Sequence, residues 1–168
     1  MPWQRPNRFW RHVFTDERDL RRAFTNDAMD RIERAIQNGE TQHRGQVAVA
    51  IESALPLLRV LRKLSPRERA IEVFGQLRVW DTEENNGVLV YLLLADHDVE
   101  IVADRGIDRK VGDARWQAIC THMEQAFRDG RFVEGLELGV REISAALAEH
   151  FPGGGGDVNE IGDRVVVL

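Results

Sequence analysis

Hydrophobic positions recur along this chain with two different periods, and each period predicts its own kind of element. Apolar residues at three- and four-residue steps predict helices over residues 26–38, 66–77, 113–129 and 132–150. Alternation with β-branched side chains predicts a strand at Gln46–Glu52. Val88–Ala95 is apolar throughout, and a polar turn joins it to a second predicted strand at Val99–Ala103. A strand that is apolar on both sides needs a layer on each face, so the pattern predicts a layered α/β fold.

Local signals mark where individual helices begin and end. Ser65, Pro66 and Glu68 form the pattern of a capping box with proline at the first helical position. This pattern predicts a helix that starts at Pro66. The first long helix is expected to be capped by Asn26 and to end at Gly39.

The two ends of the chain differ from its middle. Residues 1–24 are basic and aromatic, residues 25–151 carry the regular patterns, and a run of four glycines lies in residues 152–168. The first segment is expected to pack on its own domain, with an anionic membrane surface as the alternative. The last segment is expected to be a flexible tail. Docking of its apolar end as an extra edge strand is the alternative.

Composition narrows the class of protein. The chain has 168 residues, 43% of them hydrophobic, which suits one globular domain. Its net charge of −5, from 23 basic and 28 acidic residues, argues against nucleic acid as a partner. No secretion signal is evident, and no apolar run approaches the roughly 20 residues of a membrane-spanning helix. We therefore expect a cytoplasmic protein without a transmembrane segment, with peripheral membrane contact through residues 1–24 as the alternative to packing on the domain.

Most motifs of catalysis and metal binding are absent from the sequence. The only cysteine, Cys120, excludes disulfides within the chain and cysteine zinc sites, and it is expected to be a structural thiol. No phosphate loop, HExxH zinc pattern or GxSxG nucleophile elbow occurs. Hydrolysis by a serine or cysteine nucleophile is therefore not indicated.

A loop rich in carboxylate and amide groups, Asp81 to Asn86, comes directly before the apolar strand. Such oxygens are the ligands that Ca²⁺ and Mg²⁺ prefer, although the spacing is not that of an EF-hand. Asp104, after the second strand, and Asp113, at a helix start, can supply further oxygens. The alternative interpretation is a solvated turn and an aspartate that caps a helix.

Five stretches, taken together, resemble the TPM domain family. They are WDTEENNG at 80–87, the strand VLVYLLLA, the strand VEIVADRGI, VGDA at 111–114 and FRDGRFVEGLELG at 127–139. The resemblance covers roughly residues 25–150 and implies a three-layer αβα sandwich with a central mixed β-sheet in a single domain. The chain departs from the family at Asp96–Asp98, where relatives often carry Asp-Arg, and it lacks the signal or anchor of many relatives.

The resemblance also implies a function. Family members include thylakoid-lumen proteins associated with photosystem repair and bacterial envelope proteins. Some bind calcium or another divalent ion, and weak acid-phosphatase activity is attributed to plant members. Carried over to this chain, the resemblance implies a Ca²⁺ or Mg²⁺ site made of Asp81, Glu84, Asn86, Asp104 and Asp113.

Two functions therefore stay open, together with a purely structural domain whose loop binds nothing. The first is a divalent-cation binding module for protein interaction, assembly or quality control, with an unidentified protein partner. The alternative is a metal-dependent acid phosphatase acting on phosphate monoesters, in which Arg105 and Arg109 stabilise the phosphoryl charge. No nucleophile with a paired base is evident, so binding ranks above catalysis and the sequence does not decide whether the chain is an enzyme.

Overall fold

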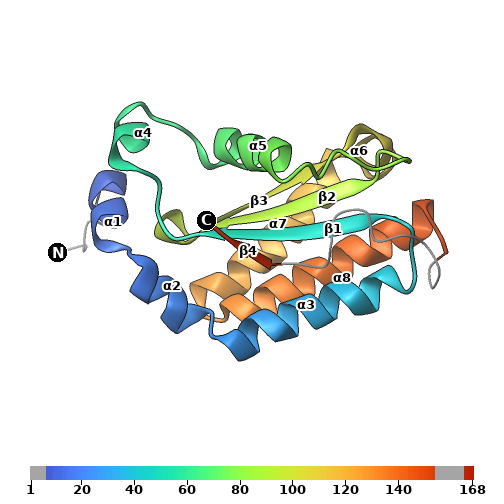
Figure 1. Cartoon of the computed structure of the whole chain (residues 1–168), viewed down its shortest axis with the longest axis horizontal. Coiled ribbons are helices and arrows are strands. Elements are labelled where there is room, and N and C mark those ends of the chain that lie inside the picture. The colour runs from blue at the N-terminus through green and yellow to red at the C-terminus, as the bar shows by residue number, and fades with distance from the viewer. Residues whose placement is uncertain (1–6, 154–164) are drawn as a thin grey trace.

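The computed structural model describes residues 7–153 and 165–168, and a mixed β-sheet is the middle layer of this part of the chain (Figure 1). Its strands are β1 (Gln46–Glu52), β2 (Gly87–Leu93), β3 (Asp98–Ala103) and β4 (Val165–Val167), in the spatial order β3-β2-β1-β4. β1 runs parallel to β2 and to β4, whereas β2 and β3 form an antiparallel hairpin. The predicted first strand and the predicted hairpin are confirmed.

Helices cover both faces of the sheet (Figure 1). α3 (Asn26–Glu40), α7 (Asp113–Arg128) and α8 (Phe132–His150) lie on one face, and α4 (Leu57–Leu61) and α5 (Pro66–Gln76) lie on the other. α1 (Arg8–Phe14) and α2 (Glu17–Ala23) precede α3, a short 3₁₀ turn (Leu94–Asp96) follows β2, and α6 (Arg105–Val111) joins β3 to α7. The single-domain αβα sandwich with a mixed sheet is therefore confirmed.

Two hydrophobic cores lie on opposite sides of the sheet, because successive residues of a strand point to opposite faces. Val47, Val49 and Ile51 of β1 pack with α3, α7 and α8, whereas Ala48 and Ala50 pack with α5. All seven residues of β2 are buried. The prediction that this apolar strand is covered on both faces is confirmed.

A buried ion pair between Arg69 and Glu52 links α5 to β1 of the sheet. The Glu52 carboxylate accepts a hydrogen bond from the Tyr91 hydroxyl at 2.6 Å and two from the Arg69 guanidinium at 2.9 and 3.1 Å. Hydrogen bonding to Glu52 raises the pKa of Arg69, and burial raises the pKa of Tyr91. Both oxygens of Glu52 are thereby satisfied, so this buried carboxylate serves the fold.

Some helix ends differ from the sequence prediction. The capping box at Ser65 is present with both of its reciprocal hydrogen bonds. α3, in contrast, is capped by Thr25 instead of Asn26, and it continues past Gly39. A Cβ on Gly39 would stand 2.1 Å from Oγ of Ser144 on α8. This glycine therefore permits close packing of two helices and does not end the first one.

The end of the predicted tail forms a strand. Val165–Val167 adds β4 to the sheet by pairing in parallel with Val49–Ile51 of β1. Residues 154–164, for which flexibility was predicted, lie outside the described residues, as do residues 1–6 of the basic segment. Among the residues that the structure describes, no helix is long and apolar enough to cross a bilayer.

Candidate functional site

The predicted acidic loop lies against the start of α6. The Ile107 amide donates to the carbonyl oxygen of Asn85 at 3.2 Å, and the Asp104 amide donates to that of Gly87 at 2.8 Å. A Cβ on Gly106 would stand 2.6 and 2.5 Å from the carbonyl oxygens of Glu84 and Asn85, so only glycine fits here. The structure therefore brings Asp104 and the loop together, and we call residues 84–86 with Asp104 the loop site.

Asp104 is the N-cap of α6, and its two carboxylate oxygens differ. Oδ1 accepts a hydrogen bond from the Arg105 amide at 2.7 Å. Oδ2 is buried and has no hydrogen-bond partner within the described residues. Burial removes the hydration of such an oxygen, and no hydrogen bond replaces it. Oδ2 can therefore bind a cation or accept a hydrogen bond.

Asp81 and Glu84 are held by arginines at the protein surface. Oδ2 of Asp81 lies 2.6 Å from Nη2 of Arg78, and Oε1 of Glu84 lies 3.1 Å from Nη2 of Arg44. All four side chains are largely exposed to solvent. Exposed ion pairs contribute about 0–1 kcal/mol, so either carboxylate can exchange its arginine for another cation at little cost.

Asn86 fixes the shape of the loop. It is 2% exposed, its side-chain amide donates to the Arg44 carbonyl oxygen at 3.3 Å, and its backbone amide donates to Oγ1 of Thr82 at 3.1 Å. Its backbone carbonyl accepts from the Gln46 amide at the start of β1. Asn86 thus links the loop to the segment that enters β1 and closes the loop on Thr82.

Asp113 lies apart from the other predicted ligands. It is exposed at the start of α7 and lines a different hollow, together with Asp98, Glu100 and Glu124. In that hollow, burial and then the neighbouring charge of Glu100 raise the pKa of Asp98 to about 6. Within the described chain, no three histidine, cysteine, aspartate or glutamate side chains converge in an arrangement that could hold a metal ion.

The structure contains a basic hollow that the sequence did not predict. Arg105, Arg109 and Lys110 line it together with Trp80 and with Asp104 of the loop site, around a volume of about 760 Å³. Arg105 and Arg109 are four residues apart, so they lie on the same face of a helix. Because the sequence does not predict a helix over residues 105–111, it identifies the two arginines without showing that they share a face.

Cys120 behaves as the sequence predicted for a structural thiol. Burial raises its pKa to about 12, and the neighbouring charge of Glu100 acts in the same direction. At neutral pH the side chain is therefore a thiol and a weak nucleophile.

Comparison with solved structures supports the fold. The chain is similar to the BA42 protein from the psychrophilic bacterium Bizionia argentinensis, with 28% identity and a TM-score of 0.76 over 86% of this chain and 95% of that one. The N-terminal domain of a protein from P. gingivalis shares the fold at 21% identity and a TM-score of 0.60, over 76% of this chain and 80% of that one. No match was found among curated proteins.

The αβα architecture and the mixed sheet agree with the family that the sequence resembles. The model of the TPM domain matches residues 18–146, which is most of the chain. This protein belongs to the TPM domain family.

Proposed function

We propose that this TPM domain is a binding module that takes up Ca²⁺ or Mg²⁺ at the loop site and acts on a protein partner. The observation that supports the cation is Oδ2 of Asp104, which is buried and has no hydrogen-bond partner within the described residues. Oxygen donors of this kind suit hard divalent cations. Asp104 would anchor the ion, and the carbonyl oxygens of Glu84 and Asn85, which face Gly106 two residues later, would supply further donors.

The exposed ion pairs of the loop favour the same proposal. A divalent ion needs additional carboxylates, and Glu84 and Asp81 are held only by the surface arginines Arg44 and Arg78. Because such pairs contribute little, the ion can displace the guanidinium groups. Arg44→Gln and Arg78→Gln should therefore strengthen cation binding, whereas loss of Asp104 should abolish it.

Thermal unfolding tests the cation site. A ligand that binds only the folded state raises the unfolding free energy by about 2.7 kcal/mol at 100 times its Kd. Ca²⁺ or Mg²⁺ should raise the Tm of the wild-type chain relative to EDTA, and Asp104→Asn should remove the rise while keeping a residue that caps helices well. Asp30→Asn, an exposed substitution of the same type on α3, is the control. An equal rise in both variants, or none in the wild type, would contradict the proposal.

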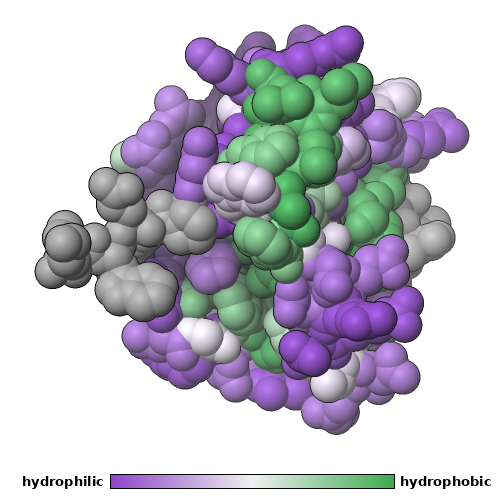
Figure 2. Space-filling model, turned by 90° about the vertical axis from the view of Figure 1, so that its left-hand side faces the viewer, coloured by the Kyte–Doolittle hydropathy of each residue, from purple (hydrophilic) through white to green (hydrophobic). Residues whose placement is uncertain are grey.

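The contact face for a protein partner is the apolar surface of α1 and α4. Figure 2 shows apolar side chains gathered on this side of the molecule. The exposed members are Trp10, Val13, Phe14, Leu57, Leu58 and Leu61. Phe14 is 72% exposed, and Leu58 and Leu61 are each 64% exposed. Large apolar and aromatic side chains clustered on adjacent helices are typical of interaction surfaces.

Phe14→Ser combined with Leu58→Ser tests this face. The double variant should fold as stably as the wild type, because both side chains are mostly exposed, and it should lose a partner that cross-links to the wild-type chain in its own cell. Ile71→Ser, an exposed apolar residue on α5, is the control. Sedimentation of the wild-type chain with anionic vesicles, without a cross-linked protein, would instead assign the face to a membrane.

Phosphate-monoester hydrolysis is the second candidate, and the basic hollow favours it. Arg105, Arg109 and Lys110 line the same hollow as Asp104, which would hold the ion, and cationic groups of this type stabilise a transferring phosphoryl group. Hydrolysis of p-nitrophenyl phosphate with Ca²⁺ or Mg²⁺ should then fall at least tenfold in Arg109→Gln. Absence of hydrolysis in a sample that binds the cation would leave the binding module as the function.

A further inference from the structure

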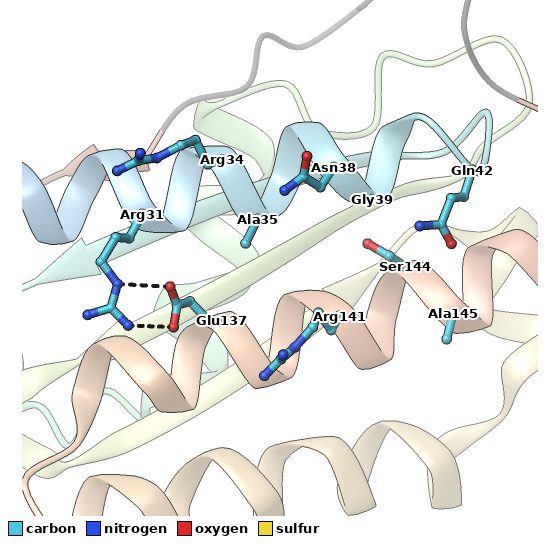
Figure 3. Close-up of a pocket in the computed structure, with 10 residues that line it drawn as sticks. All are labelled: Arg31, Arg34, Ala35, Asn38, Gly39, Gln42, Glu137, Arg141, Ser144 and Ala145. Carbon is cyan, nitrogen blue, oxygen red and sulfur yellow. Dashed lines mark hydrogen bonds and ion pairs between the residues drawn. The ribbon is translucent and has the colours of Figure 1, made fainter.

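A cleft between α3 and α8 shares no residue with the loop site. Its volume is about 570 Å³, within the range of small-molecule sites. Figure 3 shows the residues that line it, which are Arg31, Arg34, Ala35, Asn38, Gly39, Gln42, Glu137, Arg141, Ser144 and Ala145. The two helices contribute to it along facing sides, and Gln42 and Ser144 point toward the space between them (Figure 3).

The cleft is positively charged in a chain whose net charge is −5. Arg31 is compensated, because its guanidinium binds the Glu137 carboxylate through two hydrogen bonds of 3.0 and 2.8 Å. Within the described residues, the Arg34 guanidinium donates to the backbone carbonyl of Asp30, at 3.1 Å, and to no carboxylate. Neither Arg34 nor Arg141 has an acidic partner within the described residues. Two guanidinium groups of the cleft therefore remain available to an anion.

The floor of the cleft holds a hydroxyl group without a partner. Ser144 is 5% exposed, and its Oγ makes no hydrogen bond within the described residues. The hydroxyl is aimed at Gly39, where a Cβ would stand only 2.1 Å away. A buried hydroxyl without a partner costs about 1–3 kcal/mol, and a ligand atom in the cleft would satisfy it.

Behind Ser144, a histidine presents a second free atom to the same place. Nε2 of His43 is buried, has no hydrogen-bond partner among the described residues, and lies 3.5 Å from the Cβ position of Gly39. Nδ1 lies 3.1 Å from the carbonyl oxygen of Gly45, which can only accept, so Nδ1 carries the proton and Nε2 is an acceptor. Burial lowers the pKa of His43, which keeps the ring neutral. The hydroxyl of Ser144 lines the cleft, and the acceptor nitrogen of His43 lies just beyond the lining residues, near Gly39.

We propose that this cleft binds a small molecule that carries an oxyanion, either a phosphate or a carboxylate. Arg34 and Arg141 bind the oxyanion, because guanidinium groups match its geometry with paired N–H donors. The Ser144 hydroxyl, which packs against Gly39, donates to a ligand oxygen at the floor. This site is separate from the loop site and does not depend on a metal ion.

Calorimetric titration of the full chain with inorganic phosphate and with citrate, at constant ionic strength in EDTA, tests the proposal. Binding of either anion supports the site, and the tighter of the two identifies its chemistry. Arg141→Gln and Arg34→Gln should each weaken binding about tenfold. Arg18→Gln, which removes the same charge from an exposed position on α2, should leave the affinity unchanged.

Ser144→Ala separates binding from folding. The hydroxyl has no partner to lose, so urea denaturation should show an unfolding free energy at least equal to that of the wild type, while the affinity for the anion falls severalfold. Absence of binding by both anions would overturn the proposal. Binding that is lost in Arg109→Gln and retained in Arg141→Gln would also overturn it, because the anion would then occupy the basic hollow beside the loop site.

Discussion

Single residues decide which carboxylates of this protein are available for chemistry. Glu52 is buried but fully hydrogen-bonded, whereas Asp104 and Asp98 each keep one buried oxygen without a partner. The sequence placed Asp104 in a candidate site from its position after a strand. It could not identify Asp98 as unusual, because the pKa of that residue is raised first by burial and then by Glu100 and Glu124, and burial and the approach of Glu124 arise only in the folded chain.

Asp98 predicts how stability depends on pH. Its pKa rises in the folded chain from an ordinary value near 3.8 to about 6, because burial and nearby acidic groups disfavour the charge. The stabilisation linked to its protonation is therefore complete below pH 3.8 and is lost as the pH rises through 6. Asp98→Asn should accordingly raise the unfolding free energy at pH 7.5, and the gain should shrink at pH 4.5. Urea denaturation at both pH values measures this effect.

The control for this experiment is Asp30→Asn on the exposed side of α3. The same pH-dependent gain in both variants would show that it comes from net charge and not from the environment of Asp98. A constant effect of Asp98→Asn across the two pH values would also contradict the account.

Among the elements, α1 is linked to the rest of the fold by a cluster of contacts around Asp96. It has seven residues, too few to form a stable helix alone. Asp96, after β2, faces Arg8 at 2.8 Å, Arg11 at 3.1 Å and Nε2 of His12 at 3.3 Å. Burial raises the pKa of Asp96, but the contacts with His12 and Arg8 outweigh it and bring the pKa below its usual value. Nδ1 of His12 accepts from the Leu55 amide, which links α1 to the segment before α4.

Asp96→Asn should release α1. Breaking a buried ion pair costs about 3–5 kcal/mol, and we expect about 2 kcal/mol here because both arginines keep part of their hydration. Hydrogen exchange should become faster at the Leu55 amide and throughout α1, and urea denaturation should report the loss of stability. Glu17→Gln, which breaks an exposed pair with Arg21, should change neither quantity. Unchanged exchange in α1 of Asp96→Asn would show that apolar packing holds this helix.

Element boundaries were predictable where the signal lies within one element. The capping box at Ser65 and the fully apolar β2 are local patterns, and both are confirmed. α6 was not predicted because its seven residues carry too short an apolar period to be recognised. Asp104 was consequently interpreted as a loop residue, although one of its oxygens caps this helix.

At the scale of the whole molecule, the sandwich follows from the sequence but the cleft does not. An apolar β2 requires helices on both faces, and that requirement together with the family resemblance is enough to predict the layers. The cleft joins α3 to α8, whose facing residues lie about a hundred positions apart; Arg31 and Glu137 are 106 apart. The pairing of β4 with β1 is equally remote in sequence. Hydrophobic periodicity does not predict contacts between residues so far apart in the sequence, so these contacts are seen only in the folded chain.

The most direct test of the proposed cation site is titration of Ca²⁺ into ¹⁵N-labelled protein, followed by amide chemical shifts. The account predicts the largest changes at residues 84–87 and 104–107, because Asp104 and the loop carbonyl oxygens are the proposed ligands. Changes confined to Asp98, Glu100 and Glu124 would place the ion in the acidic hollow instead, and no changes at all would contradict cation binding by this domain.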